Sequence, residues 1–459
     1  MNTPAKPLVV IDIVGLTPDL MGEHTPRLNA LINDGFMATM SDVFPAVTCT
    51  AQATMLTGRL PRDHGIVANG WYFRDLAEVM FWRQSNQLVQ AEQVWDTLRR
   101  DHPDLSCAQV FWWFNMYANV DYSITPRPIY PADGRKLPGL YSGPADLQQR
   151  LQATLGDFPL FNFWGPASDI RSSQWIAAAA REVFRAHRPS LQFVYLPHLD
   201  YNLQRLGPHH DDIGSDVAAI DAVAGELIDY LRGEGAEIMV VSEYGIEAAT
   251  GHVNINQCLR EHDYIAVRET LGWELLDAGA SRAFAVADHQ AAHVYVRDPA
   301  DLEKVTTLLS QTPGIERVLS GGEKAAWGLD HARSGELVAI AEPGHWFTYY
   351  YWLDEAKAPD FARTVDIHRK PGYDPVELFL DPDLTLPRAK IAWRVLQKKL
   401  GLRMLMDVIP LQPQLVKGTH GRLAASPMQG PLFISSNQRL AREHLHMQDV
   451  KGLICQHWV

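Results

Sequence analysis

Cysteine is scarce in this chain and is not arranged in pairs. The 459 residues include 4 cysteines, at positions 49, 107, 258 and 455, and they form no CxxC motif. This spacing excludes a disulfide framework or a zinc ribbon and is typical of free thiols in a reducing compartment. The apolar run before Asp12 is too short for the core of a signal peptide, and no stretch approaches the ~18 apolar residues of a membrane span. We therefore expect a cytoplasmic protein.

The chain also lacks an excess of positive charge. It has 41 Lys and Arg against 54 Asp and Glu, which gives a formal net charge of −13. A net-acidic surface argues against a general nucleic-acid or membrane-surface binder, although a local basic pocket stays possible. GxGxxG, GxxxxGK[ST] and GxSxG motifs are absent, so neither a dinucleotide site nor a P-loop nor a serine-hydrolase elbow is indicated.

The apolar runs that are present alternate with helical patterns. Buried strands are expected at residues 7–14, 191–196 and 237–242, and helices at 27–33, 91–100, 173–187 and 214–232. Strands that alternate with helices predict an α/β fold with a mostly parallel sheet. The hydrophobic content of 46% is ample for a large core.

The order of the predicted elements changes from about Phe284, where patterns typical of a strand, a helix and two more strands follow within 70 residues. We expect a small α+β lid here, inserted as residues 284–400 between core parts 1–283 and 401–459. Its aromatic segment, His345–Trp352, is either lid core or a wall that faces the substrate. In the second case Trp346 and Tyr350 would stack on a base or ring of the substrate.

Polar side chains follow the predicted strands at the point where each strand ends. They are Asp12, Asp200, Glu243 and, late in the chain, His420. The carboxyl ends of parallel strands meet at one edge, so these groups should converge there. A cluster of carboxylates needs a counter-charge, and a divalent metal ion is the usual one.

Thr48 precedes a helical stretch that runs to about Leu56. Its hydroxyl is either a helix cap or a nucleophile, because a helix N-terminus favours a phosphate and the alkoxide that attacks it. Asn69 lies in an HGIVANG turn and either donates its amide to a phosphoryl oxygen or simply forms an Asn-Gly turn.

The motifs, taken in order, resemble the alkaline phosphatase superfamily. They are a strand ending in Asp12, FPxxT, TGxxPxxHGIxxN, a strand followed by HxD, VVSExG and a late GTHG. The nearest branch is the nucleotide pyrophosphatase/phosphodiesterase group, related to phosphonoacetate hydrolases. The resemblance implies a three-layer α/β/α core with a lid, Thr48 as nucleophile and Asn69 as the ligand of a phosphoryl oxygen.

The resemblance also implies one or two divalent metal ions, Zn²⁺ or Mn²⁺. One ion would be held by Asp12, Thr48, Glu243 and Tyr244, and the other by Asp200, Gln204 and His420. Gln204 and Tyr244 stand where the family has histidines, and Glu243 where it has aspartate, so oxygen donors that suit harder ions replace imidazoles. Other histidines that could fill these positions are His198, His209, His210, His289 and His368.

From these features we predict a metal-dependent hydrolase of phosphoric esters, similar to phosphodiesterases and nucleotide pyrophosphatases, that acts through a phospho-threonine. Its partner would be a small-molecule phosphoester, with no specific nucleic acid and no membrane. One alternative is a phosphonate hydrolase with Lys324 and Lys370 aimed at a carboxylate. Another is a degenerate member that binds a phosphorylated metabolite without turnover.

Overall fold

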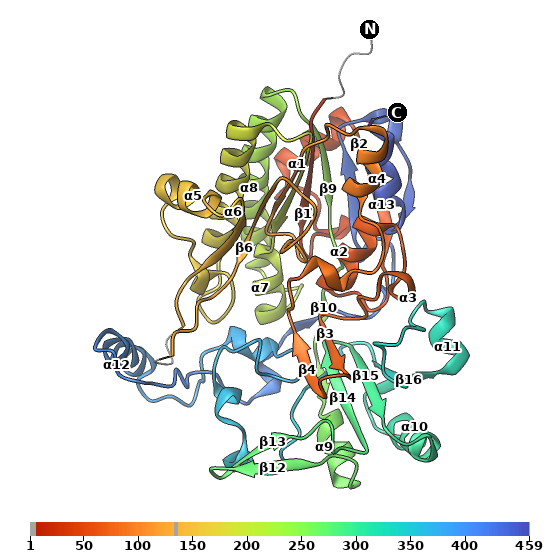
Figure 1. Cartoon of the computed structure of the whole chain (residues 1–459), viewed down its shortest axis with the longest axis vertical. Helices are drawn as coiled ribbons and strands as arrows, with labels where there is room; N and C mark the ends of the chain where they lie inside the picture. Colours follow the sequence, from red (N-terminus) through yellow and green to blue (C-terminus); the bar gives the residue numbers. More distant parts are fainter. Residues whose placement is uncertain (1–5, 133–135, 459) are drawn as a thin grey trace.

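A nine-stranded sheet forms the larger part of the computed structural model, which describes residues 6–132 and 136–458 (Figure 1). Its strands, from edge to edge, are β21 (His444–His446), β2 (Phe36–Ser41), β20 (Leu432–Ser435), β9 (Glu237–Val241), β1 (Leu8–Ile13), β8 (Leu191–Leu196), β5 (Cys107–Val110), β6 (Tyr122–Pro126) and β7 (Leu140–Gly143). Antiparallel pairing occurs at β20 and β7, and the other neighbours run parallel. The sheet is therefore mostly parallel, as predicted.

Helices cover both faces of this sheet. The central strands are therefore buried on both sides, and their side chains are mostly apolar. Val9, Ile11 and Ile13 of β1 pack into one core, and Leu8 and Val10 pack into the opposite one. The first core contains residues of α1 (Pro26–Asp34), α5 (Leu147–Leu155), α6 (Ile170–His187), α7 (His198–Leu206) and α8 (Ile213–Gly233); the second contains residues of α2 (Thr48–Thr57), α4 (Val94–Asp101) and α13 (Asp449–Gln456). The predicted three-layer α/β/α fold is confirmed.

A smaller antiparallel sheet lies beneath the carboxyl ends of the large one in Figure 1. Its order is β14 (Ala283–Asp288), β15 (Ala291–Val296), β17 (Leu337–Ala341) and β16 (Ile315–Ser320), and α10 (Leu302–Ser310) and α11 (Gly321–Ala326) connect its strands. The expected β-α-β-β pattern is present, with the first stretch folded as a hairpin that turns at His289. Its core also contains Val253 and residues of α9 (Ile255–Glu261), which precede position 284.

Four two-stranded ribbons lie outside the two larger sheets in the part of the chain that the structure describes. They are β3 (Gly70–Phe73) with β4 (Glu78–Phe81), β10 (Glu247–Ala248) with β19 (Gly418–Thr419), β11 (Gly251–Val253) with β18 (His345–Phe347), and β12 (Val267–Thr270) with β13 (Trp273–Leu276). The remaining helices are α3 (Pro61–His64) and α12 (Pro387–Lys399), the latter at the left edge of Figure 1.

Strand β21 and helix α13 follow the strand at residues 432–435. They complete the second core. Among the described residues, no helix is both long and apolar enough to cross a bilayer.

Candidate functional site

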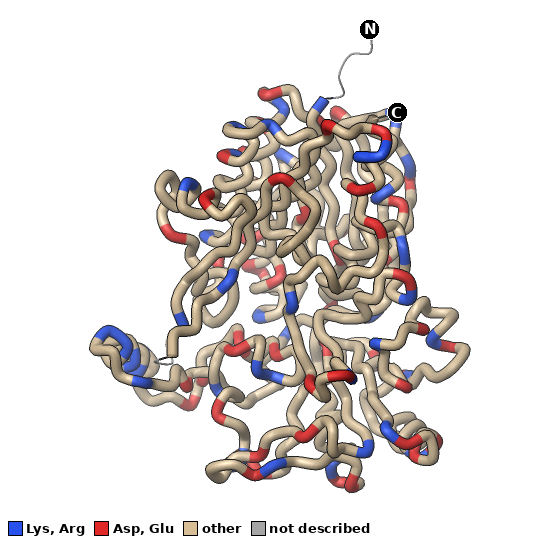
Figure 2. Tube along the Cα trace, viewed as in Figure 1, with Lys and Arg blue, Asp and Glu red and all other residues tan. Residues whose placement is uncertain are grey.

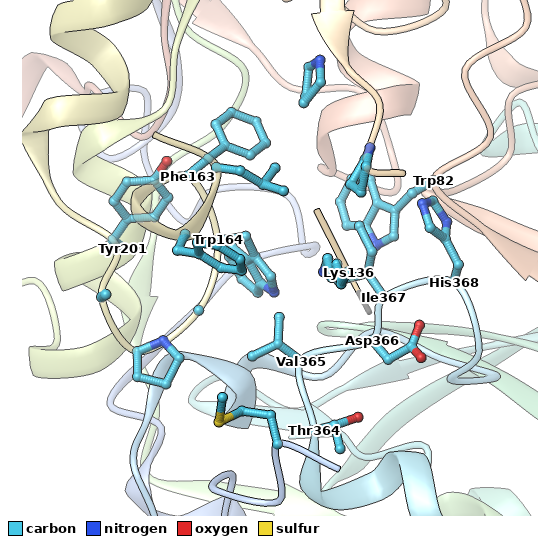
Figure 3. A pocket seen from close by; sticks show the side chains of 18 of the residues that line it. Trp82, Lys136, Phe163, Trp164, Tyr201, Thr364, Val365, Asp366, Ile367 and His368 are labelled. Atoms are coloured by element: carbon cyan, nitrogen blue, oxygen red, sulfur yellow. The ribbon is translucent and has the colours of Figure 1, made fainter. Parts of the chain in front are cut away.

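A cavity of about 860 Å³ opens at the carboxyl ends of β8 and β9. One part of its lining is polar and consists of Thr48, Asp200, Tyr244, His289, Tyr373 and His420. The other part is mostly aromatic and aliphatic and includes Trp82, Trp113, Phe163, Trp164, Ile391 and Val395. Figure 3 shows Phe163, Trp164 and Tyr201 across from Trp82 and His368. The cavity thus brings predicted site residues to one end of a wide apolar chamber.

Thr48 is the first residue of α2 and faces this cavity. Val47 before it is extended, and every residue of α2 is buried. The Thr48 Oγ1 lies 3.1 Å from the Tyr244 hydroxyl oxygen, and the Glu243 carboxylate is a close neighbour whose pKa the threonine hydroxyl lowers. The hydroxyl therefore lies beside two acid–base groups and sits where the helix N-terminus favours negative charge.

Asn69 lies beside the same helix end. Its Oδ1 accepts a hydrogen bond of 2.9 Å from the Cys49 N–H, and its Nδ2 donates to the Asp288 carboxylate at 3.1 Å. The backbone N–H of Asn69 donates to the other Asp288 oxygen at 2.7 Å. Burial raises the pKa of Asp288 to about 7. The small sheet, through the end of β14, thus fixes the residue predicted to hold a phosphoryl oxygen.

Asp12 and Glu243 share a hydrogen-bond donor that sequence analysis missed. Gln52 Nε2 donates to Asp12 Oδ2 at 3.2 Å and to Glu243 Oε1 at 2.7 Å, while Gln52 Oε1 accepts from the Trp113 N–H at 2.8 Å. Burial, followed by the neighbouring charge of Glu243, raises the pKa of Asp12, and burial also raises that of Glu243. Burial therefore disfavours a negative charge on both members of the pair at once. Gln52 lies one helical turn after Thr48, and this spacing is the signal that could have found it.

Asp200 is held in a similar way by neutral donors. Gln204 Nε2 donates to Asp200 Oδ2 at 2.8 Å, and the Tyr244 hydroxyl donates to Oδ1 at 3.4 Å. Gln204 Oε1 accepts in turn from the Tyr373 hydroxyl at 2.9 Å. Burial, followed by the charge of Glu243, raises the pKa of Asp200 to about 7.

Two neutral imidazoles complete the polar end. His420 Nδ1 donates to the Ala46 carbonyl at 2.7 Å, and its Nε2 lies 3.9 Å from Asp200 Oδ1. The His420 ring stacks on Tyr244 with 3.6 Å between centroids, and the His289 ring lies 3.6 Å from it on another side. Burial lowers the pKa of His420 to about 3 and lowers that of His289 as well. Sequence analysis named His289 as a candidate, and the structure brings it into the cluster.

The donor set does not fit the two-ion arrangement that the resemblance implies. A metal site needs several carboxylate or imidazole atoms whose lone pairs point at one position. Within residues 6–132 and 136–458, no group of three His, Cys, Asp or Glu is arranged to hold an ion. Hydrogen-bond donors bind these carboxylates instead: the amides of Gln52 and Gln204 and the phenol of Tyr244. Gln204 and Tyr244 stand at positions where metal ligands were expected.

The expected aromatic wall is not where sequence analysis placed it. Trp346 and Tyr350 are buried in hydrophobic cores, with 1% and 4% of their surfaces exposed, and neither lines the cavity. Trp346 belongs to β18, which pairs with β11 and turns inward. The aromatic lining comes instead from Trp82, Trp113 and Trp164, so the substrate-facing role of residues 345–352 is corrected to a core role.

The remaining candidates are engaged elsewhere or lie at the outer part of the cavity. His198 pairs with Asp216, whose carboxylate is 3.2 Å away. Lys370 forms buried ion pairs with Asp374 and Glu377, and Lys324 donates to a backbone carbonyl. His209 and His210 are exposed to solvent. His368 lines the cavity, and burial lowers its pKa to about 4.

Comparison with solved structures supports the fold. Murine ectonucleotide pyrophosphatase / phosphodiesterase 5 has a TM-score of 0.59 at 16% identity, covering 98% of this chain and 94% of its own. Its inactive threonine-to-alanine variant, solved in complex with AMP, has the same TM-score of 0.59 and identity of 16%, with coverage of 99% and 95%. Phosphonoacetate hydrolase of Sinorhizobium meliloti 1021, solved with phosphonoformate, has a TM-score of 0.62 at 14% identity, with coverage of 99% and 96%. These similarities show a shared fold.

Sequence comparison identifies the family. An uncharacterised pyrophosphatase/phosphodiesterase of Schizosaccharomyces pombe is 23% identical over 256 residues, which is 53% of this chain. The match spans 46% of that relative's length. The family described as type I phosphodiesterase / nucleotide pyrophosphatase matches residues 8–374. Its members hydrolyse phosphoric esters and generally depend on divalent metal ions. The chain therefore belongs to the type I phosphodiesterase / nucleotide pyrophosphatase family, as its motifs predict.

Proposed function

We propose that the chain hydrolyses a small phosphoric diester or pyrophosphate and that Thr48 is its nucleophile. The observation that carries this proposal is the position of Thr48 Oγ1, at the first turn of α2 and in the cavity, 3.1 Å from the Tyr244 hydroxyl and beside the Glu243 carboxylate. A hydroxyl at a helix N-terminus with a carboxylate beside it meets the two needs of an alkoxide nucleophile. These are a proton acceptor and a positive environment.

In this proposal, Glu243 accepts the proton of Thr48 as Oγ1 bonds to phosphorus. The bond from phosphorus to the leaving oxygen breaks, and the leaving oxygen takes a proton from solvent. Water then attacks phosphorus and passes a proton to solvent, the bond from phosphorus to Thr48 Oγ1 breaks, and Glu243 returns its proton to Oγ1 as the phosphoryl product leaves. Tyr244 keeps its proton, because burial raises its pKa, and donates a hydrogen bond to the developing charge.

The lining supports a substrate with a flat apolar group. Trp82, Trp113 and Trp164 provide indole faces on which a nucleobase or aryl ring would stack. The AMP complex of a protein of the same fold adds support for a nucleotide-like ligand. The free thiols are consistent with the expected cytoplasmic location. The phosphonate alternative has less support, because both of its lysines are bonded elsewhere.

The test is hydrolysis of bis(p-nitrophenyl) phosphate by wild-type protein, Thr48→Ala and Thr48→Ser. Each protein is assayed after chelation and after refilling with Zn²⁺, Mn²⁺ or Mg²⁺. We expect Thr48→Ala to lose roughly a hundredfold or more of the turnover and Thr48→Ser to keep part of it, since serine retains a hydroxyl. Mass spectrometry of the quenched reaction should find phosphate on Thr48. Full activity of Thr48→Ala would contradict the nucleophile assignment.

A second candidate is binding of a phosphorylated metabolite without turnover. It is favoured by Gln52, whose amide holds Asp12 and Glu243 where the family generally uses an ion. Calorimetric titration of wild-type protein with AMP separates the two candidates. Binding without hydrolysis under any of the metal conditions supports the second candidate, and phospho-threonine formation supports the first.

A further inference from the structure

Helix α12 presents its apolar side chains to solvent. Leu386, Ala389, Trp393, Leu396 and Leu400 follow one another at intervals of three and four residues, so they lie on one face. All five are exposed, with exposed fractions of 69% for Leu386, 55% for Trp393 and 66% for Leu400. A surface helix of a soluble domain ordinarily turns such a face inward, so this arrangement is inverted.

The polar side chains of the helix face the protein instead. Lys390 Nζ lies 3.0 Å from Asp407 Oδ2, and Arg394 Nη2 lies 3.0 Å from Asp407 Oδ1. Lys398 Nζ donates to the Lys136 carbonyl at 2.8 Å and lies over the Phe161 ring. These bonds fix the rotation of α12 about its axis, so the apolar face points outward by construction.

The segment that carries this face is also basic. Residues 384–406 contain six basic side chains and no acidic one, in a chain of net charge −13. The six are Arg388, Lys390, Arg394, Lys398, Lys399 and Arg403. Figure 2 shows the helix as a blue segment at the edge of the molecule. Lys390 and Arg394 share Asp407, and with the other four basic side chains the segment keeps a net positive charge beside the exposed leucines and the tryptophan.

We propose that α12 docks on an anionic lipid bilayer and inserts its apolar face, the α12 face, among the headgroups. Helices that bind such an interface have tryptophan and leucine on one face and Lys and Arg around it. A second copy of the chain is a poorer occupant, because it would bring the same positive charges into contact. This inference goes beyond the proposed function and does not depend on it.

Docking would bring one wall of the cavity near the bilayer. Ile391, Val395, Lys398 and Lys399 of α12 line the cavity. They lie on the side of the helix opposite the α12 face, so the helix itself would stand between the bilayer and the cavity.

The test is sedimentation of the full chain with vesicles of phosphatidylcholine, alone or with about a third of phosphatidylglycerol. We expect binding to the anionic vesicles, several-fold weaker binding to neutral ones, and release by salt. The double variant Trp393→Glu/Leu396→Glu should bind roughly tenfold more weakly or worse. The matched control is Leu76→Glu, which changes a leucine that is 60% exposed far from α12 and should bind like wild type.

Two further measurements keep the outcome clear. The tryptophan emission of wild-type protein should shift to shorter wavelength on anionic vesicles, and Trp393→Phe should lose that shift. Circular dichroism checks that each variant is folded. Wild-type protein that stays in solution with anionic vesicles would overturn the proposal. So would a dimer in analytical ultracentrifugation that Trp393→Glu/Leu396→Glu dissolves while vesicle binding is absent.

Discussion

Two pairs of buried carboxylates in this molecule are neutralised in different ways. Asp374 and Glu377 share the ammonium of Lys370, whose Nζ lies 2.7 Å from an oxygen of each. Asp12 and Glu243 share the amide of Gln52, which carries no net charge. Both pairs are almost completely buried. The difference lies in what balances the charge: a fixed cation in the first pair, and an amide with a retained proton in the second.

This difference in counter-charge suggests a structural role for Asp374 and Glu377 and an acid–base role for Asp12 and Glu243. Burial alone would lower the pKa of Lys370, but the charges of Asp374 and Glu377 outweigh it and raise that pKa, so the ammonium is permanent. At the site, burial raises the pKa values of both Asp12 and Glu243, which favours their protonated forms and leaves them able to exchange a proton. A permanent cation suits a structural cluster, whereas a movable proton beside Thr48 suits acid–base chemistry.

Removing the fixed cation should have the largest effect on stability. Lys370→Met leaves Asp374 and Glu377 buried without a counter-charge, and we expect it to lower the free energy of unfolding by about 3–5 kcal/mol. Urea denaturation at neutral pH measures the change. Lys304→Met, at an exposed position on α10, is the control and should stay within about 0.5 kcal/mol of wild type. A small effect of Lys370→Met would show that the cluster is not held by charge.

Replacing the amide should convert the second pair toward the behaviour of a metal site. Gln52→Glu adds a third carboxylate to Asp12 and Glu243, and we expect a loss of about 2–4 kcal/mol at neutral pH. Added Mn²⁺ or Zn²⁺ should restore part of this stability, because an ion can replace the lost donor. Thermal melts with and without the ion or a chelator measure this.

Wild-type protein provides the comparison for the same melts. Because the Gln52 amide already donates to one oxygen of each carboxylate, we expect its Tm to change little on chelation. Gln52→Met, which removes the donor without adding charge, should be destabilised but insensitive to metal. A large fall in the wild-type Tm on chelation would contradict the role given to Gln52.

The sequence predicted the elements better than the contacts. Strands β1, β8 and β9 were placed to within a residue or two, because continuous apolar runs that end in polar residues mark buried parallel strands. The expectation that Asp12, Asp200, Glu243 and His420 meet at one edge followed from the carboxyl ends of parallel strands alone. Position along the chain, however, says nothing about which hydrogen a side chain directs at which oxygen.

Two errors show that limit. Gln52 lies inside a fully buried helix. From the sequence alone it is an ordinary polar residue, because nothing there indicates that it donates to Asp12 and Glu243. The aromatic run at residues 345–352 reads equally well as a wall or as a core, and the pairing of β18 with β11 decides for the core. Long-range partners made the difference in both cases.

The pH dependence of stability should report the movable protons. The pKa of Asp288 is raised from 3.8 to about 7 by burial, so between these values the folded chain binds a proton that the unfolded chain has released. Its contribution is fully present below pH ~4 and is lost as the pH rises through ~7, with a slope approaching about 1.4 kcal/mol per unit. Asp288→Asn should flatten the dependence in this range by up to one proton. Urea titrations from acid to neutral pH test this, and an unchanged slope would contradict it.

We expect the smallest effect on stability from loss of the hydrogen bond between the Tyr373 hydroxyl and the Gln204 amide oxygen. Tyr373→Phe keeps the ring that stacks on His289 at 3.7 Å but removes the hydroxyl that donates to Gln204 Oε1. Since both groups are uncharged, we expect a loss of only about 1 kcal/mol. Tyr349→Phe is the matched control, because the Tyr349 hydroxyl is buried and has no hydrogen-bond partner among the described residues. Its removal should cost nothing measurable. If Tyr373→Phe proved as damaging as Lys370→Met, the Gln204 amide would be supporting a charge on Asp200, and this side of the site would resemble the fixed cluster rather than the movable one.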